Sequence, residues 1–376
     1  VMLYEIDSTY TDSTIYKKRP TYVTNTLDSA TTFQLTNLKA GKYKLLALKD
    51  EGNNYLFNQK TDKIGFVENT VTIPTDSTYL ITLFKETTNF RATKPSQVAK
   101  NRIVFGYEGD PSEMKIELLS QKPDSFQHKI TRDTEKDTLN FWFKPVLKNI
   151  DSLVFKVSHP QKVDTFTVRM KDMYRDSLNF KNLSPPSLNF RDTLTIQSAT
   201  PLQSVKKELI SVMDKDSTLL SFSADVDSLK NRLKLKWDTK PENRYKITFL
   251  PGAIEDFFGN ANDTLNYSAS TKAPSSLGSM RVTLKNAKSY PVIVQLTDDK
   301  GVVKYEMFSD KQVPLYDFRD IEPGKYMVRV IHDENGNRRW DTGNYLQKRQ
   351  PEKISYLPGA IELRPNWEWE QEFILK

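Results

Sequence analysis

"LKAGKYKLLALKDEGNNYLFN", residues 38–58, is matched without a gap by "IEPGKYMVRVIHDENGNRRWD", residues 321–341. In each copy a Tyr opens a run in which apolar and polar residues alternate, and alternation with period two is typical of a half-buried strand. The "PG" pair predicts a tight turn before that strand, with Pro323 at its first central position and Gly324 supplying a positive φ. Two copies this far apart indicate a duplicated β domain rather than a solenoid.

The residues before the two copies differ in number. Two alternating stretches precede the second copy, "GSMRVTLK" near Met280 and "PVIVQLTD" near Val292. Only "VMLYEID", residues 1–7, precedes the first copy, and its position and pattern match the second of those stretches. We therefore expect the first strand of the first copy to be missing from this sequence, which we interpret as a fragment or a processed product.

A short phrase also recurs, in which Asp and then Ser or Thr open an alternating run. Asp and Ser/Thr favour turns and the run after them favours a strand. The phrase begins at Asp137, Asp151, Asp164, Asp176, Asp192, Asp227 and Asp263. Many short strands at regular spacing predict an all-β protein built from β-sandwiches. Residues 204–213 fit a helix or a strand about equally.

Linkers divide the chain into four units of sandwich size. Breaks containing Pro95, Pro185 and Pro274 predict boundaries that give units 1–88, 89–182, 183–272 and 273–376. The linkers are short and contain proline, so we expect the tandem sandwiches to form a stiff, elongated array.

Composition narrows the range of functions. The chain of 376 residues is 37% hydrophobic and 27% charged, with a net charge of +7. The basic residues are scattered, which argues against a nucleic-acid groove. The absence of cysteine excludes thiol catalysis, disulfides and thiolate metal sites. No apolar run approaches the ~20 residues of a transmembrane helix.

The stretch "YKITFLPGAIEDFFGNANDTLNYSAST", residues 245–271, resembles the closing strands of S-layer-type bacterial Ig-like domains. The two repeat copies look like prealbumin-like or carboxypeptidase-regulatory-like sandwiches. Their order, with the ending "RPNWEWEQEFIL", is similar to Ig-like domain-containing outer-membrane or surface lipoproteins of Bacteroidota. The resemblance implies an envelope location, outer-membrane-associated and at the cell surface, with attachment to the membrane only through a lipid anchor upstream of these residues.

Residues typical of catalysis are sparse, so we expect no enzymatic activity. The three histidines, His128, His159 and His332, have no HExxH or GxSxG context. His332 adjoins an Asp/Asn loop but should point away from Asp333 if the strand continues. No carboxylate pair is singled out, and no glycine pattern predicts a phosphate-binding loop.

The loop "DENGNRRWD" predicts a weak calcium site. Its oxygens fall at positions 1, 3, 5, 7 and 9 of an EF-hand-like spacing, the seventh through a backbone carbonyl. The candidate ligands are Asp333, Asn335, Asn337, Arg339 and Asp341. Arg338 stands where Gly is expected, although Gly336 can take the sharp turn, and Asn344 replaces the bidentate Glu. The alternative is a turn in which these side chains accept backbone N–H groups. The equivalent loop at Asp50, Asn54 and Asn58 has one carboxylate and is a weaker candidate.

Aromatic residues offer a different binding chemistry. Trp142 and Trp237 lie on alternating runs that favour core packing, whereas Trp367 and Trp369 share one face of the last predicted strand. Two such rings can form a carbohydrate platform, a core or an interface.

Together these features predict a non-enzymatic scaffold that docks other outer-membrane or surface proteins, because sandwich edges and end loops offer docking surfaces. The most concrete form is an accessory lipoprotein subunit of an outer-membrane assembly or secretion complex. A carbohydrate-binding surface module, and auxiliary domains of a hydrolase whose catalytic part lies elsewhere, remain alternatives. The only cofactor predicted is a structural calcium ion.

Overall fold

A computed structural model describes residues 1–26, 31–147, 150–190 and 192–375. The described chain is all-β, and its only helical elements are three 3₁₀ turns. The fold class predicted from the sequence is therefore confirmed. The four predicted units are called here the first unit (1–88), the second unit (89–182), the third unit (183–272) and the fourth unit (273–376).

The first unit has one sheet among its described residues. Its elements are β1 (Met2–Glu5), η1 (Asp12–Tyr16), β2 (Tyr22–Val23), β3 (Gly41–Lys49), β4 (Lys63–Phe66) and β5 (Val71–Ile73). The strand order is β2-β1-β3-β4, and β5 pairs with β3.

The second unit pairs a five-stranded sheet with a three-stranded sheet. Its strands are β6 (Arg91–Ala92), β7 (Ser96–Ala99), β8 (Arg102–Glu108), β9 (Lys115–Leu118), β10 (Gln127–Arg132), β11 (Thr138–Lys144), β12 (Ser152–His159) and β13 (Lys162–Arg169). The orders are β10-β11-β8-β6, with β7 beside β8, and β13-β12-β9.

The third unit packs two four-stranded sheets and carries a two-stranded ribbon. Its elements are β14 (Phe180–Asn182), β15 (Ser187–Leu188), β16 (Leu194–Ser198), β17 (Leu202–Val205), η2 (Lys207–Leu209), β18 (Ile210–Met213), β19 (Phe222–Asp227), β20 (Arg232–Trp237), β21 (Arg244–Phe249), β22 (Ile254–Asp256) and β23 (Leu265–Thr271). The orders are β14-β16-β20-β19, β15-β23-β21-β18 and β17-β22.

The fourth unit pairs a three-stranded sheet with a five-stranded sheet. Its elements are η3 (Pro274–Ser276), β24 (Gly278–Lys285), β25 (Val292–Thr297), β26 (Val303–Ser309), β27 (Tyr316–Ile321), β28 (Gly324–His332), β29 (Ile354–Tyr356), β30 (Ile361–Leu363) and β31 (Glu368–Ile374). The orders are β27-β24-β31 and β26-β25-β28-β29, with β30 beside β28.

The Asp-Ser/Thr phrase marks strand starts at some positions and not at others. Strands begin one or two residues after Asp137, Asp151, Asp192 and Asp263, whereas Asp164 lies inside β13. At Asp227 the phrase instead forms the hairpin turn between β19 and β20, and the Asp227 carboxylate accepts the N–H of Lys230 at 2.9 Å. Residues 204–213, left open between helix and strand, are mostly β17 and β18 with the single turn η2 between them.

The tight turn before each repeat strand is built differently from the prediction. Gly41 and Gly324 open β3 and β28 and are not among the residues with positive φ. The left-handed residues are Asn37, with φ 57°, and its repeat counterpart Asp320, with φ 55°. Asn and Asp tolerate this conformation better than most residues, so the chain turns before the "PG" pair rather than at it.

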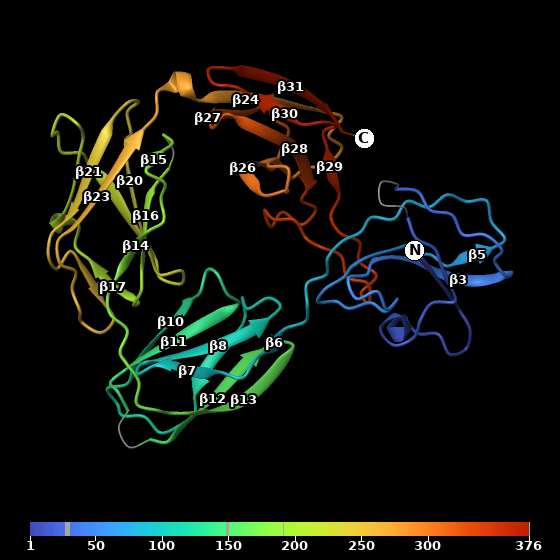
Figure 1. Ribbon diagram of the computed structural model, residues 1–376, viewed down its shortest axis with the longest axis horizontal. Coiled ribbons are helices and arrows are strands. Elements are labelled where there is room, and N and C mark those ends of the chain that lie inside the picture. The colour runs from blue at the N-terminus through green and yellow to red at the C-terminus, as the bar shows by residue number, and fades with distance from the viewer. Residues whose placement is uncertain (27–30, 148–149, 191, 376) are drawn as a thin grey trace.

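The four units do not form the open, elongated row expected from the linkers. Figure 1 shows the fourth unit lying back beside the first, with the red connection between β28 and β29 reaching the blue first unit. Tyr345 of that connection is part of a hydrophobic cluster that otherwise belongs mainly to the first unit. Contacts between residues far apart in the sequence therefore hold the fourth unit against the first. Linker composition does not reveal such contacts.

Candidate functional site

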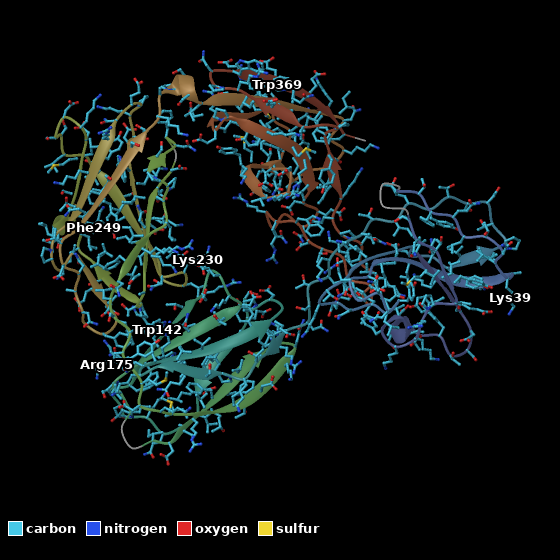
Figure 2. The ribbon with its side chains drawn as sticks, viewed as in Figure 1. Lys39, Trp142, Arg175, Lys230, Phe249 and Trp369 are labelled. Carbon is cyan, nitrogen blue, oxygen red and sulfur yellow. The ribbon has the colours of Figure 1, made fainter. Side chains whose placement is uncertain are left out.

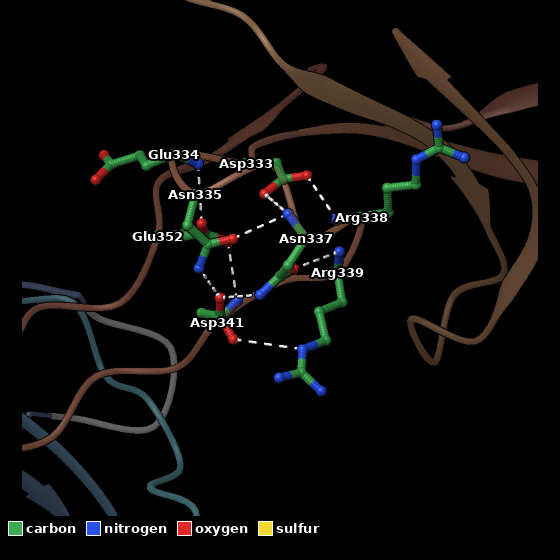
Figure 3. A network of polar contacts seen from close by, with 8 residues as sticks. All are labelled: Asp333, Glu334, Asn335, Asn337, Arg338, Arg339, Asp341 and Glu352. Carbon is green, nitrogen blue, oxygen red and sulfur yellow. Dashed lines mark hydrogen bonds and ion pairs between the residues drawn. The ribbon is translucent and has the colours of Figure 1, made fainter. Parts of the chain in front are cut away.

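The connection between β28 and β29 holds the predicted site residues and has two parts. Residues 333–341, here called the Asp/Asn turn, follow β28 directly. Residues 342–351, here called the latch, continue to the first unit before the chain returns to β29. Figure 3 shows the polar network of the Asp/Asn turn.

Asp333 anchors the turn from inside the fold. Its side chain is 0% exposed, and its two carboxylate oxygens accept the backbone N–H groups of Asn337 at 3.1 Å and Arg338 at 2.8 Å. Gly336 and Arg338 have positive φ, 72° and 64°, and these two left-handed residues bend the backbone around the carboxylate. A buried carboxylate is tolerable here because backbone donors satisfy it.

Glu352 closes the turn, and the sequence reasoning did not find it. Its Oε1 accepts the N–H of Glu334 and its Oε2 that of Asp341, both at 2.9 Å. Burial, and secondarily the charges of Asp341 and Asp333, raise the pKa of this carboxyl above its ordinary value, while the backbone N–H bonds oppose the rise. The two ends of the turn are thus held by one side chain (Figure 3).

The first unit repeats this arrangement at the homologous loop. Asp50 accepts the N–H of Tyr55 at 2.7 Å, and Tyr55 has φ 61°, as Arg338 does in the second copy. Asp62 takes the place of Glu352, because it accepts the N–H groups of Glu51 at 3.2 Å and Asn58 at 2.8 Å. The donors 51 and 58 align with 334 and 341, so the repeat extends to individual hydrogen bonds.

The predicted calcium ligands come together, but the amide oxygens of Asn335 and Asn337 accept the backbone N–H groups of Asn337 and Arg339. Asn335 and Asn337 both direct their amide nitrogens at Oδ2 of Asp341, the latter at 2.5 Å. The guanidinium of Arg339 lies 3.7 Å from the other oxygen of Asp341. A cation would require both amides to rotate so that their oxygens face Asp341. The part of the chain that the structure describes contains no group of three or more His, Cys, Asp or Glu side chains placed to hold a metal.

Calcium at this turn stays a prediction with a direct test. A bound ion raises the melting temperature by mass action. The full chain melted with millimolar calcium and with chelator should differ if the ion binds, and the double change Asp333→Ala with Asp341→Ala should remove the difference. Equal melting temperatures would leave the turn held by its own hydrogen bonds.

The latch inserts a single aromatic side chain into the first unit. Tyr345 is 0% exposed, its ring lies 5.3 Å from that of Phe66 in an edge-on contact, and its hydroxyl is 3.0 Å from that of Tyr10. Its backbone N–H donates to the buried carboxylate of Glu86 at 2.5 Å. Burial raises the pKa of the Tyr345 hydroxyl far above its ordinary value, so the ring enters uncharged.

Polar contacts on both sides of Tyr345 fix the latch. The hydroxyl of Thr342 donates to the carbonyl of Lys85 at 2.6 Å, and the Gln350 amide donates to the carbonyl of Phe66 at 3.0 Å. Trp340, the counterpart of Phe57, packs against the same cluster and donates its indole N–H to the carbonyl of Glu352. The Asp/Asn turn therefore positions the latch, and the latch joins the fourth unit to the first.

A second junction lies between the second and third units. Figure 2 shows Trp142 where these units meet. Its ring carries the Arg102 guanidinium at 4.9 Å and meets Phe258 of the third unit edge-on at 6.2 Å. The Lys144 ammonium donates to the carbonyl of Phe257 at 2.5 Å. A cavity of about 610 Å³ at this junction is lined in part by Lys144 and Phe258.

The histidines have packing roles in the structure. His128 stacks on Phe141 with ring centroids 4.8 Å apart, and His159 stacks on Phe90 at 4.0 Å. His332 contacts the hydroxyl of Ser355 at 3.1 Å.

The tryptophans divide between cores and surface. Trp237 is buried in the third unit's core. Trp367 and Trp369 lie nearly parallel, at 11° with centroids 6.4 Å apart. Trp367 is 41% exposed, whereas Trp369 packs against the fourth unit's core.

Comparison with known proteins gives one family match. A family described as uncharacterised proteins conserved in bacteria (DUF2141) matches residues 271–352, which include the Asp/Asn turn and the latch. No curated protein matches the chain. The described helices include none long and apolar enough to cross a membrane.

Several solved structures show remote similarity. The alpha-2-macroglobulin of Escherichia coli, in a structure spanning domains MG0-NIE-MG1, is 13% identical, with 50% of this chain and 90% of that chain covered and a TM-score of 0.24. Titin domains A168–A170 are 10% identical, with 74% and 99% covered and a TM-score of 0.18. The major pilin subunit BcpA of Bacillus cereus is 10% identical, with 73% and 84% covered and a TM-score of 0.19. The fold class rests on the sheets described above rather than on these similarities.

Proposed function

We propose that this chain is a non-enzymatic interaction protein of the bacterial cell envelope, an accessory lipoprotein subunit that docks other outer-membrane or surface proteins within an assembly or secretion complex. The observation that carries the proposal is the latch. Tyr345 and its flanking hydrogen bonds join the fourth unit to the first, so that the units act as one frame rather than as separate beads.

A joined frame suits docking because it holds several surfaces in fixed relation. Pre-organised surfaces lose less conformational entropy when a partner binds. The junction at Trp142 supports the hypothesis of a single frame, because it fixes the second unit against the third. The family match supports a bacterial protein. The envelope location is proposed from the resemblance to Bacteroidota surface lipoproteins.

The test compares three forms of the chain as bait. Tagged native chain, Tyr345→Ala and the matched control Tyr345→Phe are incubated with detergent-solubilised envelope, and captured proteins are quantified against empty beads. We expect the native chain and Tyr345→Phe to enrich the same outer-membrane proteins, and Tyr345→Ala to enrich them less because its frame opens. Enrichment of no envelope protein over empty beads would overturn the proposal.

A second candidate function rests on the paired tryptophans. Trp367 and Trp369 have nearly parallel rings, of which that of Trp367 is exposed, and the Arg364 guanidinium lies over the Trp367 ring at 5.0 Å. Such a platform fits the apolar face of a sugar ring, so the chain would bind envelope glycans. Calorimetric titration with oligosaccharides should then show binding that Trp367→Ala removes and that Tyr356→Ala, a change at another exposed aromatic of the fourth unit, preserves. Equal binding by both variants would exclude the platform.

A further inference from the structure

Two cavities lie where the β10–β11 hairpin of the second unit meets the β19–β20 hairpin of the third unit. Their volumes are about 370 and 400 Å³. The hairpins touch, because the backbone N–H of Arg132 donates to the carbonyl of Leu229 at 2.6 Å. The two cavities share part of their lining and are here called together the junction cleft. The shared lining residues are Arg132, Asp133, Thr134, Glu135 and Lys230.

Buried polar side chains form the floor of the junction cleft. Alternate residues of β11 face the core of the second unit, which leaves Asn140 and Trp142 on the opposite face, toward the third unit. The indole N–H of Trp142 donates to the hydroxyl of Thr131 at 2.8 Å. The amide of Asn140 is also buried, with 9% of the residue exposed, but it has no hydrogen-bond partner among the described residues. Buried amides are normally paired, so Asn140 has a donor and an acceptor to offer to a ligand in the cleft.

Cationic side chains outnumber acidic ones around the junction cleft. Arg102 is paired with Asp176 at 3.0 Å, so its charge is compensated. The other five cations make no ion pair with a carboxylate in the described part of the chain, and Nε of Arg232 is buried without a hydrogen-bond partner. Of the acids, Asp133 already accepts two backbone N–H groups of its own turn. The five cations are Arg132, Lys136, Lys181, Lys230 and Arg232, and the three acids are Asp133, Glu135 and Asp137.

This lining favours a ligand that carries both carboxylates and hydroxyl groups. The planar guanidinium of an arginine matches a carboxylate in two parallel hydrogen bonds, and Arg132 and Arg232 line the cleft from the two units. The side-chain amides of Asn140, Asn179 and Gln197 match hydroxyl groups, because an amide both donates and accepts. Helix N-termini, a common source of phosphate sites, do not contribute, since the three described 3₁₀ turns lie outside the lining. Acidic sugars carry both of the matching groups, and two adjoining cavities suit a short chain of them.

We propose that the junction cleft binds an acidic oligosaccharide, whose carboxylates pair with Arg132 and Lys230 and whose hydroxyl groups bond to the amide of Asn140. Arg132 belongs to the second unit and Lys230 to the third, so the bound sugar chain bridges the junction that Trp142 forms. Figure 2 shows Lys230 on the side of the third unit that faces the second. This site goes beyond the proposed docking function, and it is separate from the surface around Trp367 in the fourth unit.

The experiment is calorimetric titration of the full chain with hexagalacturonate at low salt. The matched neutral probe is the methyl ester of the same oligosaccharide, which has the same sugar rings and no charge. We expect the acidic probe to bind at least about tenfold more tightly than the ester, because only its carboxylates pair with the cations. Its affinity should fall near 1 M salt, where the screening length is about 3 Å. Equal affinities for the two probes, or binding of neither, would overturn the proposal.

Two double changes that remove the same charge separate the cleft from the overall positive charge of the chain. Arg132→Gln with Lys230→Gln removes one cation from each side of the cleft. Lys115→Gln with Lys236→Gln removes one exposed cation from each of the same two units outside the cleft. The first pair should weaken binding of hexagalacturonate by at least about tenfold, and the second by less than about twofold. Similar losses for the two pairs would mean non-specific attraction and would overturn the site.

Asn140→Leu tests the floor of the cleft. Leucine has a similar size and removes an amide that has no partner in the free chain, so the melting temperature should not fall. The affinity for hexagalacturonate should fall by about two- to tenfold, as expected for the loss of one hydrogen bond. A lower melting temperature with unchanged affinity would mean that Asn140 supports the fold and does not contact the ligand, which would overturn its assignment.

Two further measurements fix the place and the class of the ligand. Trp367→Ala should leave the affinity for hexagalacturonate unchanged, because that ring lies in the fourth unit. A loss of affinity with this variant would place the sugar at the paired tryptophans and overturn the cleft site. Inorganic phosphate at the same concentration should not displace the oligosaccharide. Displacement would mean that the cleft takes any anion, which would overturn the assignment to acidic sugars.

Discussion

The first and fourth units share their hydrogen-bonded turns and differ in what surrounds them. Asp50 and Asp62 hold one turn as Asp333 and Glu352 hold the other, down to aligned backbone donors. The latch has no counterpart in the first unit, where only residues 59–61 separate Asn58 from Asp62. A local residue pattern therefore preserves the turn through duplication. The inserted residues and the neighbouring strands determine which other unit each copy contacts.

The largest effect is expected where the latch enters the first unit. Tyr345→Ala should lower the free energy of unfolding by about 3–5 kcal/mol, because it removes a fully buried aromatic ring and leaves a cavity. Tyr345→Phe keeps the ring and should cost about 1 kcal/mol, since one net hydrogen bond is lost. Chemical denaturation measures both changes.

Small-angle scattering measures how Tyr345→Ala and Tyr345→Phe change the overall size of the molecule. Tyr345→Ala should yield a larger radius of gyration than the native chain or Tyr345→Phe, because the fourth unit separates from the first. An unchanged radius for Tyr345→Ala would show that other contacts hold the units together.

The two turn-closing carboxylates offer a matched comparison of the repeat copies. Asp62→Ala and Glu352→Ala each leave two backbone N–H groups without their acceptor, which should cost about 1–3 kcal/mol apiece. Only Glu352→Ala should also loosen the latch, because its turn positions Trp340 and Tyr345. Hydrogen exchange near the first unit's Phe66 and Glu86 should increase with Glu352→Ala. A larger increase with Asp62→Ala than with Glu352→Ala would contradict this coupling.

A pH effect should distinguish Glu352 from other carboxylates. Its pKa is raised in the folded state from the ordinary 4.5, chiefly by burial. The folded state therefore binds the proton more tightly, so its stabilisation is complete below 4.5 and is lost as pH rises through the raised pKa. The melting temperature of the native chain should fall across that pH window relative to that of Glu352→Gln, which has no titrating group at this position. Parallel curves of melting temperature against pH for the two proteins would refute the raised pKa of Glu352.

Particular residues show which parts of the site can be predicted from the sequence. The gapless alignment finds the strand pattern and Asp333, because a turn beside an alternating run is local. It does not find Glu352, because latch residues separate that side chain from the turn and its counterpart is a different amino acid, Asp62. Nor does it find Tyr345, whose partners Phe66 and Glu86 lie in another unit. Linker composition contains no information on contacts between units, so the elongated row predicted from it differs from the structure.

The smallest effect is expected at the rim of the latch. Lys348 pairs with Asp12 of the first unit at 2.5 Å, but the two side chains are 45% and 36% exposed. Exposed ion pairs contribute about 0–1 kcal/mol, because water and salt already solvate the charges. Lys348→Met should therefore lower stability by less than about 1 kcal/mol. The difference should vanish near 1 M salt, where the screening length falls to about 3 Å. Denaturation at low and high salt measures this, with Lys49→Met, in an exposed pair within the first unit, as control. A loss at Lys348 that matched Tyr345→Ala, or that persisted in high salt, would mean that charge rather than the buried ring joins the fourth unit to the first.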